Sequence, residues 1–172
     1  MNSIAVTVVG HDRPGIIAEV TARLAELGLN LEDSTMTLLR GHFAMMLICA
    51  GTATAGEVEK ALDGLTADGS LIVSARQVQP ELDVSPPGAS YVLSVHGGDR
   101  PGIVSAIARV VADAGGNIVD LTTRLTGDLY VVVADVDLPA EVDVDSLQTR
   151  LDDAAREVGV DVNLRPQETD VL

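Results

Sequence analysis

The sequence predicts an α+β protein built from two tandem copies of one βαββαβ unit. The run GHDRPGI at residues 10–16 returns as GGDRPGI at residues 97–103. Each copy lies between a β-like run and a helix-like run, and the match continues in register from Asn30 to Asn117 and from Asp33 to Asp120. A repeat of fewer than about ninety residues within a chain of 172 residues indicates a duplicated domain.

The first unit begins with a predicted strand at residues 4–9, which are rich in β-branched side chains and end at Gly10. A helix is expected from Pro14 onward, because apolar residues recur at helical spacing as far as Leu27 and Gly28 is a natural stop signal. The unit therefore opens as strand, loop and helix.

The remaining elements of the first unit follow from turn and capping signals. Residues 31–39 and 43–49 are predicted strands on either side of a tight turn at residues 40–42. Thr54 and Glu57 have the spacing of a capping box, which predicts a helix start. Residues 71–78 supply the last strand.

The second unit repeats this order. Helices are predicted at residues 101–114 and after a cap formed by Asp145 and Gln148. The other predicted elements of this unit are strands. They are residues 91–95, 117–125, 129–136 and 160–164. An antiparallel sheet in the order βαββαβ is the ferredoxin-like arrangement.

The domain boundaries follow from the repeat and from turn residues between the copies. We expect one domain at residues 1–79, a short linker at 80–89 that contains Pro86-Pro87-Gly88, a second domain at 90–166 and a polar tail at 167–172.

The strand at residues 43–49 is apolar on both of its faces. A sheet with helices on one face only usually alternates apolar and polar residues, so this strand predicts that the uncovered sheet face has a partner. The expected partner is the other half of the chain, a second copy in a homodimer, or both.

Composition narrows the class of partner. The chain has 26 acidic and 11 basic side chains and a formal charge of −15, which repels nucleic-acid backbones. Aromatic residues make up only 2% of the chain, so few rings are present for stacking on unpaired bases. Direct binding of nucleic acid is therefore not expected.

The sequence also indicates a cytoplasmic protein that has no membrane partner. The single cysteine, Cys49, cannot form an intrachain disulfide and has apolar neighbours, as expected for a buried thiol in a reducing compartment. The first residues lack a signal-like pattern, and the longest apolar run, residues 43–50, is too short to span a bilayer.

The duplicated loop offers groups that suit a zwitterion. Pro14 presets the backbone for a first helical turn, and Gly15 lets a ligand approach the chain closely. Free N–H groups at a helix start favour a carboxylate. Asp12 could cap the helix or face an ammonium group, and Asn30 offers a donor and an acceptor. Alternatively, the loop only starts a helix.

These residues resemble the ACT domain, a small βαββαβ module that binds amino acids in regulators of amino-acid metabolism. The Asp-Arg-Pro-Gly element with a downstream Gly-x-Asn carries the resemblance, which covers nearly the whole chain as two tandem copies. Residues 30–45 are most similar to the glycine cleavage system transcriptional repressor group.

The resemblance implies a ligand gripped by the loop after the first strand and by the start of the second strand, often at an interface between two domains. Some ACT sites carry His where Gly10 stands and Asn where Asp12 stands. The implied ligand-binding residues are Gly10, His11, Asp12, Gly15, Ile16, Asn30 and Leu31, with Gly97, Gly98, Asp99, Gly102, Ile103, Asn117 and Ile118 in the second copy.

We therefore expect a non-enzymatic protein that senses a small amino acid, glycine or serine among the candidates, and passes the signal to a protein partner. No catalytic residue, cofactor or metal is expected, because His11, His42 and His96 lack the spacing of a metal motif. One alternative is a protein interaction module without a ligand. A remote alternative is an acylphosphatase-like hydrolase in which Arg13 and Asn30 hold a phosphate.

Overall fold

The computed structural model describes residues 2–79 and 88–167, which divide into two compact units. Unit 1 lies within residues 1–82 and unit 2 within residues 83–172. Residues 80–87 of the predicted linker and 168–172 of the predicted tail lie outside the described residues. Among the described helices, none is long and apolar enough to cross a membrane.

Each unit has the element order βαββαβ. Unit 1 consists of β1 (Asn2–His11), α1 (Ile16–Glu26), β2 (Asn30–Leu39), β3 (His42–Gly51), α2 (Ala55–Thr66) and β4 (Leu71–Val78). Unit 2 consists of β5 (Gly88–Gly98), α3 (Ile103–Asp113), β6 (Asn117–Thr126), β7 (Leu129–Pro139), α4 (Val144–Val158) and β8 (Val160–Pro166). Strand β5 begins before the predicted Tyr91, so Gly88 and Ala89 belong to a strand.

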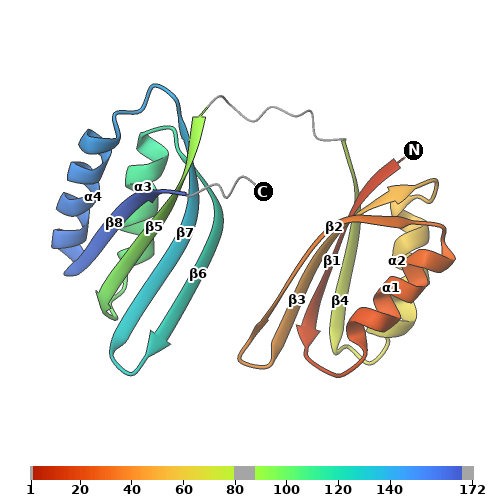
Figure 1. Ribbon diagram of the computed structural model, residues 1–172. Coiled ribbons are helices and arrows are strands. Elements are labelled where there is room, and N and C mark those ends of the chain that lie inside the picture. Colours follow the sequence, from red (N-terminus) through yellow and green to blue (C-terminus); the bar gives the residue numbers. More distant parts are fainter. Residues whose placement is uncertain (1, 80–87, 168–172) are drawn as a thin grey trace. The chain divides into compact units, whose positions relative to one another are not determined.

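The two sheets have the same topology. The strand order is β2-β3-β1-β4 in unit 1 and β6-β7-β5-β8 in unit 2, and all neighbouring strands are antiparallel. In each unit both helices lie on the same side of the sheet (Figure 1). The predicted ferredoxin-like fold is confirmed.

Each core lies between a sheet and its two helices. In unit 1, Ile4, Val6 and Val8 of β1 are fully buried against residues of α1 and α2 such as Val20 and Leu62. Cys49 is buried in the same cluster, and this burial raises the pKa of its thiol. All buried side chains among the described residues are hydrophobic. The cores therefore leave polar chemistry to the loops and outer surfaces.

The β2–β3 connection is a two-residue turn. Arg40 and Gly41 both have positive φ, 51° and 82°, as a type I′ hairpin turn requires. The turn sets the register in which Leu39 lies opposite His42 and Met36 lies opposite Met45. A two-residue turn at Gly127 and Asp128 joins β6 to β7, as the sequence predicts, and only Gly127 has positive φ there.

The helix starts agree with the sequence at α2 but not elsewhere. Thr54 and Glu57 form the predicted capping box. The cap predicted at Asp145 was wrong: α4 is capped by Asp143, whose carboxylate accepts hydrogen bonds from the backbone N–H groups of Asp145 and Ser146. The helix predicted from Pro14 begins later, with Gly15 as the N-cap of α1.

Helix side chains cover the outer edges of β4 and β8. The N–H of Ala75 in β4 donates to Glu59 of α2 at 3.0 Å. At the equivalent place in unit 2, the N–H of Leu164 donates to Gln148 at 2.9 Å, and Gln148 donates to the carbonyl of Val162 at 3.4 Å. These bonds occupy backbone groups that a further strand would use.

Gly10 and Gly97 are required by packing at the end of the central strand. A β-carbon on Gly10 would lie 2.0 Å from the carbonyl oxygen of Ser70, and one on Gly97 would lie 3.0 Å from the Cα of Val160. The first strand of each unit can therefore approach the last one closely only because this residue has no side chain.

Replacing Gly10 by alanine is expected to destabilise unit 1 by about 1–3 kcal/mol or more, because the new β-carbon meets backbone atoms. Gly56→Ala is the matched control, since a β-carbon on that helical glycine has nothing within 4 Å. Urea unfolding followed by circular dichroism measures both. Equal stability of the two variants would contradict the packing role.

Thr54→Ala is expected to lower the stability of unit 1 by about 1 kcal/mol at neutral pH through loss of the α2 cap. Hydrogen bonds from the Thr54 backbone and hydroxyl lower the pKa of Glu57, so its contribution is present above the ordinary carboxyl pKa and is lost as the pH falls through the lowered value. The difference in unfolding free energy between wild type and Thr54→Ala, measured by urea unfolding, should therefore become smaller in acid. A constant difference between pH 3 and 7 would show that the Thr54 cap does not depend on the charge of Glu57.

Candidate functional site

The loop between β1 and α1 is held at both of its sides by backbone hydrogen bonds. The N–H of His11 donates to the carbonyl of Ser70 at 3.1 Å, and the N–H of Asp12 donates to the carbonyl of Gly41 at 3.0 Å. The loop is thus fixed to the start of β4 and to the β2–β3 hairpin. Its position does not depend on a bound ligand.

The helix start in this loop has no side-chain cap. Gly15, the N-cap of α1, has φ of 93°, and Gly102, the N-cap of α3, has φ of 96°. No side chain accepts a hydrogen bond from the first turn of either helix, so Asp12 is not the cap that the sequence allowed. The first N–H groups of both helices remain available to an anion.

The predicted site residues at the two helix starts present backbone groups, and not side chains, to a ligand. Ile16 and Ile103 are buried in the two cores. A β-carbon on Gly15 would meet only Glu19, at 3.5 Å, and one on Gly102 would meet nothing within 4 Å. A small ligand can therefore approach the backbone at both glycines.

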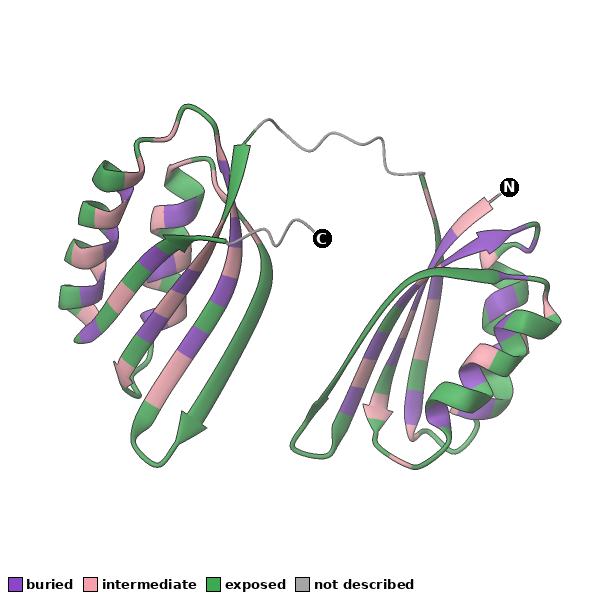
Figure 2. Cartoon of the chain, viewed as in Figure 1, coloured by how far each residue is buried: buried purple, intermediate pink, exposed green. Residues whose placement is uncertain are grey.

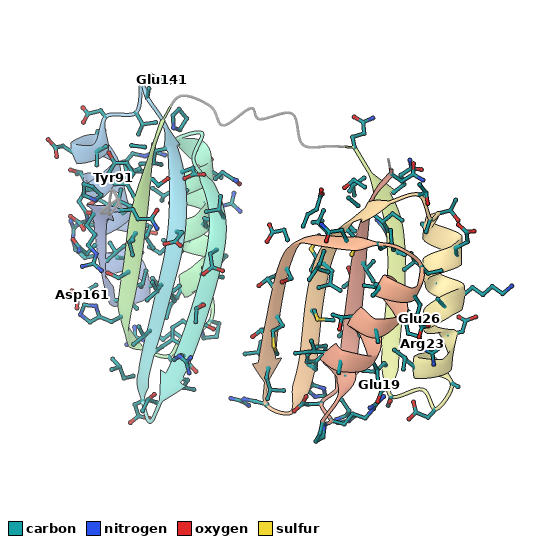
Figure 3. All side chains as sticks on the ribbon, turned by 45° about the vertical axis from the view of Figure 1, so that its right-hand side comes forward. Glu19, Arg23, Glu26, Tyr91, Glu141 and Asp161 are labelled. Carbon is teal, nitrogen blue, oxygen red and sulfur yellow. The ribbon has the colours of Figure 1, made fainter. Side chains whose placement is uncertain are left out.

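The two loops differ in charge. Arg13 forms a bidentate pair with Glu19 of α1, with N···O distances of 2.9 and 2.8 Å. This pairing raises the pKa of Arg13 and lowers that of Glu19, which is labelled on α1 in Figure 3. The sequence did not indicate this pair, because the two residues are six apart and only one of them lies in the helix.

In unit 2, Ala106 stands where Glu19 stands in unit 1, and α3 has no acidic residue in its first turn. Arg100 instead packs at the C-terminal end of α4, where its Nη1 lies 2.7 Å from the place of a β-carbon on Gly159. The first turn of α3 therefore carries no counterpart of the Arg13–Glu19 pair.

The sequence-predicted residues at the start of the second strand lie far from the loop of the same unit. Asn30 pairs with Ala50, which pairs with Ser3 at the beginning of β1, whereas His11 at the end of β1 adjoins the loop. The eight steps from Ser3 to His11 correspond to about 27 Å of strand. One unit alone therefore does not bring Asn30 and Leu31 to the loop, and Asn117 and Ile118 lie in the same way in unit 2.

Strand β2 is an exposed edge. All ten of its residues are exposed, and the strand is green along its length in Figure 2. Leu31, Met36 and Leu38 on the helix side of β2 are 42%, 47% and 51% exposed. In unit 2, β6 is exposed except at Ile118. These edges are available to a neighbouring strand.

Two of the three histidines lie together. His11 and His42 are opposite each other on β1 and β3, with ring centroids 5.0 Å apart. In unit 2 the equivalent positions are Gly98 and Leu129. Within residues 2–79 and 88–167, no group of three or more His, Cys, Asp or Glu residues is arranged to hold a metal ion.

Comparisons with known proteins agree with this geometry. A family model described as ACT domain matches residues 2–76 and again residues 90–165. A UPF0237 protein of Methanopyrus kandleri is 44% identical over 72 residues, which are 41% of this chain and 80% of that protein. A UPF0237 protein of Listeria innocua is 35% identical over 75 residues, 44% of this chain and 84% of that protein.

Two solved structures share the whole architecture. An unknown protein from Galdieria sulphuraria is 32% identical with a TM-score of 0.82, covering 97% of this chain and 99% of that one. A protein provisionally described as a glycine cleavage system transcriptional repressor has a TM-score of 0.75 at 20% identity, covers 98% of both chains and shows a common fold. Family match, topology and loop geometry coincide in both halves: the chain belongs to the ACT domain family and carries two ACT domains in tandem.

Proposed function

We propose that this chain is a non-enzymatic regulatory protein that binds a small amino acid and modulates a protein partner. The observation that carries the proposal is the duplicated helix start of α1 and α3, where an accessible left-handed glycine replaces a side-chain cap in both ACT domains. Unpaired N–H groups at the positive end of a helix dipole favour a carboxylate.

The same loop supports recognition of the ammonium group. Asp12 and Asp99 are exposed beside the helix starts and accept no hydrogen bond from them. A carboxylate near an anion site suits a ligand that carries both charges, such as an α-amino acid. The proposed contacts are the N–H groups at Gly15, Ile16, Gly102 and Ile103 for the carboxylate, with Asp12 and Asp99 for the ammonium.

A second ACT domain beside the edge strand would complete each site. The loop and Asn30 lie at opposite ends of one sheet. A second domain that pairs antiparallel with the exposed β2 edge would therefore place its own equivalent of Asn30 at the loop end of this sheet. The polar groups of Asn30 and Asn117 would then add a donor and an acceptor to the ligand. This arrangement assigns no contact to His11, Leu31, Gly98 or Ile118, and Gly10 and Gly97 are explained by packing.

Regulation requires that the ligand bind one arrangement of the domains more tightly than another. A ligand with equal affinity for two arrangements does not shift the equilibrium between them. A site shared between neighbouring domains has this property, since the ligand binds only the associated form tightly. The strong negative charge favours a protein as the partner over nucleic acid. We propose that the protein acts as a homodimer.

Isothermal titration of the full chain with small amino acids, glycine and serine first, is expected to show binding. A ligand of glycine's size is limited to about −7.5 kcal/mol, so the dissociation constant should be micromolar or weaker. Asp12→Ala combined with Asp99→Ala should weaken binding about tenfold or more, because each removes a charge-assisted contact.

Asp128→Ala, at a hairpin turn of unit 2, serves as the control and should leave binding unchanged. If no amino acid produces heat and none shifts the melting temperature, the amino-acid sensor is wrong. The interaction module without a ligand then becomes the better account of the exposed strand edges.

The hydrolase alternative is opposed by the contacts of Arg13. Its guanidinium is already paired with both carboxylate oxygens of Glu19, and Asn30 lies at the other end of the sheet. We expect no hydrolysis of acetyl phosphate by the wild-type chain in a colorimetric phosphate-release assay. Turnover that disappears in Arg13→Ala would establish the enzyme instead.

A further inference from the structure

The sheet face of unit 1 that the helices leave uncovered is largely apolar. We define the open face of unit 1 by the residues that alternate with the core residues on β1, β3 and β4. Its most exposed large apolar members, Val9, Met46 and Ile72, are 41%, 46% and 72% exposed. The full set is Ser3, Ala5, Thr7, Val9, Ala44, Met46, Ile48, Ala50, Ile72, Ser74, Arg76 and Val78.

The equivalent face of unit 2 carries several carboxylates among apolar and basic side chains such as Val133 and Arg165. Where β3 carries Ile48 and Ala50, β7 carries Asp135 and Asp137. Ile72 at the outer strand likewise corresponds to the exposed Asp161. The two sheets therefore differ in the chemistry of their open faces, and the apolar surface is more continuous in unit 1 than in unit 2.

Opposite charges flank the apolar centre of the unit 1 face. Asp33 on β2 lies opposite Ile48, Ile48 lies opposite Ala5, and Ala5 lies opposite Arg76 on β4. These four residues form one row across the sheet. The row begins with the Asp33 carboxylate at one edge and ends with the Arg76 guanidinium at the other. Both groups are exposed, and neither takes part in an ion pair among the described residues.

We infer that the open face of unit 1 packs face to face on the same face of a second copy of this chain. A two-fold axis parallel to the strands maps each row onto itself and exchanges its two ends. Asp33 of one copy then lies over Arg76 of the other, twice in the interface. Aligned sheets of this kind pack with their strands about 30° apart.

The same two-fold rotation also places large side chains of one copy opposite small side chains of the other. Along the row, Ile48 of one copy lies over Ala5 of the other, so a large side chain meets a small one. A hollow on this face is lined by Ser3, Ala5 and Ala50 together with larger side chains such as Ile48 and Glu32. The small residues leave room for the opposing isoleucine. Interdigitation of large and small side chains is how two sheets fill the space between them.

The size of the face suits a reversible dimer. Four strands at about 4.8 Å spacing over the eight residues of β4 give a footprint of roughly 500 Å². Counted on both copies this is about 1,000 Å², just below the range of about 1,200–2,000 Å² for stable specific interfaces, so the complex should dissociate on dilution.

The equivalent face of unit 2 is a poorer partner for the same surface. It would bring Asp135 over Ala5 and Asp137 over Ser3, and neither carboxylate would meet a cation there. Burial of an unpaired carboxylate is costly, whereas a second unit 1 face places the Asp33 carboxylate over a guanidinium. The inference does not depend on ligand binding.

Sedimentation velocity of the full chain without amino acid, from about 1 to about 100 μM, tests the inference. Wild type should associate as its concentration rises. Asp33→Arg or Arg76→Asp alone should weaken association about tenfold or more, because each places like charges opposite each other, and the double variant D33R/R76D should recover wild-type association to within about threefold.

Ile48→Asp should abolish association over this range, and it copies a residue that unit 2 carries at the same place in the fold. Asp120→Arg in unit 2 is the matched control and should associate as wild type does. A chain that stays monomeric at every concentration, an unaffected Ile48→Asp, or a double variant no better than the single ones would each overturn the inference. Amino-acid titration reports separately on the proposed ligand sites.

Discussion

Right-handed crossovers determine the layout of both domains. The connection from β1 to β2 and the connection from β3 to β4 run in opposite directions and move toward opposite edges of the sheet, so two right-handed crossovers place both helices on one face. The core forms between this face and the helices. The other face and the β2 edge are left to intermolecular contacts, and the interactions proposed here all use these surfaces.

The same layout separates the parts of the ligand site. Since α1 returns along the whole sheet, the residue that ends the first strand and the residue that starts the second lie at opposite ends. In the proposed site, the glycine N-caps hold the anion at one end and Asn30 supplies polar groups at the other. Under this proposal each ACT domain contributes half a site at each end, so that ligand binding is coupled to association.

Periodicity and turn residues predicted the fold well because they report local preferences. The tight turn at Arg40 and Gly41 and the capping box at Thr54 depend on neighbours within a few residues, and both are present. The α4 cap was wrong because Asp143 and Asp145 are both acceptable caps, and only the path of the chain after β7 selects Asp143.

The site was less predictable than the fold because it depends on contacts between distant residues. Sequence alone could not separate a glycine that admits a ligand, such as Gly15, from Gly10, which admits a neighbouring strand. It also could not show that Glu19 engages Arg13, or that Asn30 lies away from the loop. The uneven polarity of the two open faces was visible only in part, through the apolar strand at residues 43–49.

The side chains of Glu59 and Gln148 restrict where a further strand can join each sheet. Each occupies the outer backbone of the last strand in its unit, so each sheet can be extended from one edge only. An edge-to-edge pair of such domains has no remaining edge at which a third could join. The chain carries two such edge strands, β2 and β6, so association through strand pairing closes only when both edges pair within the same assembly.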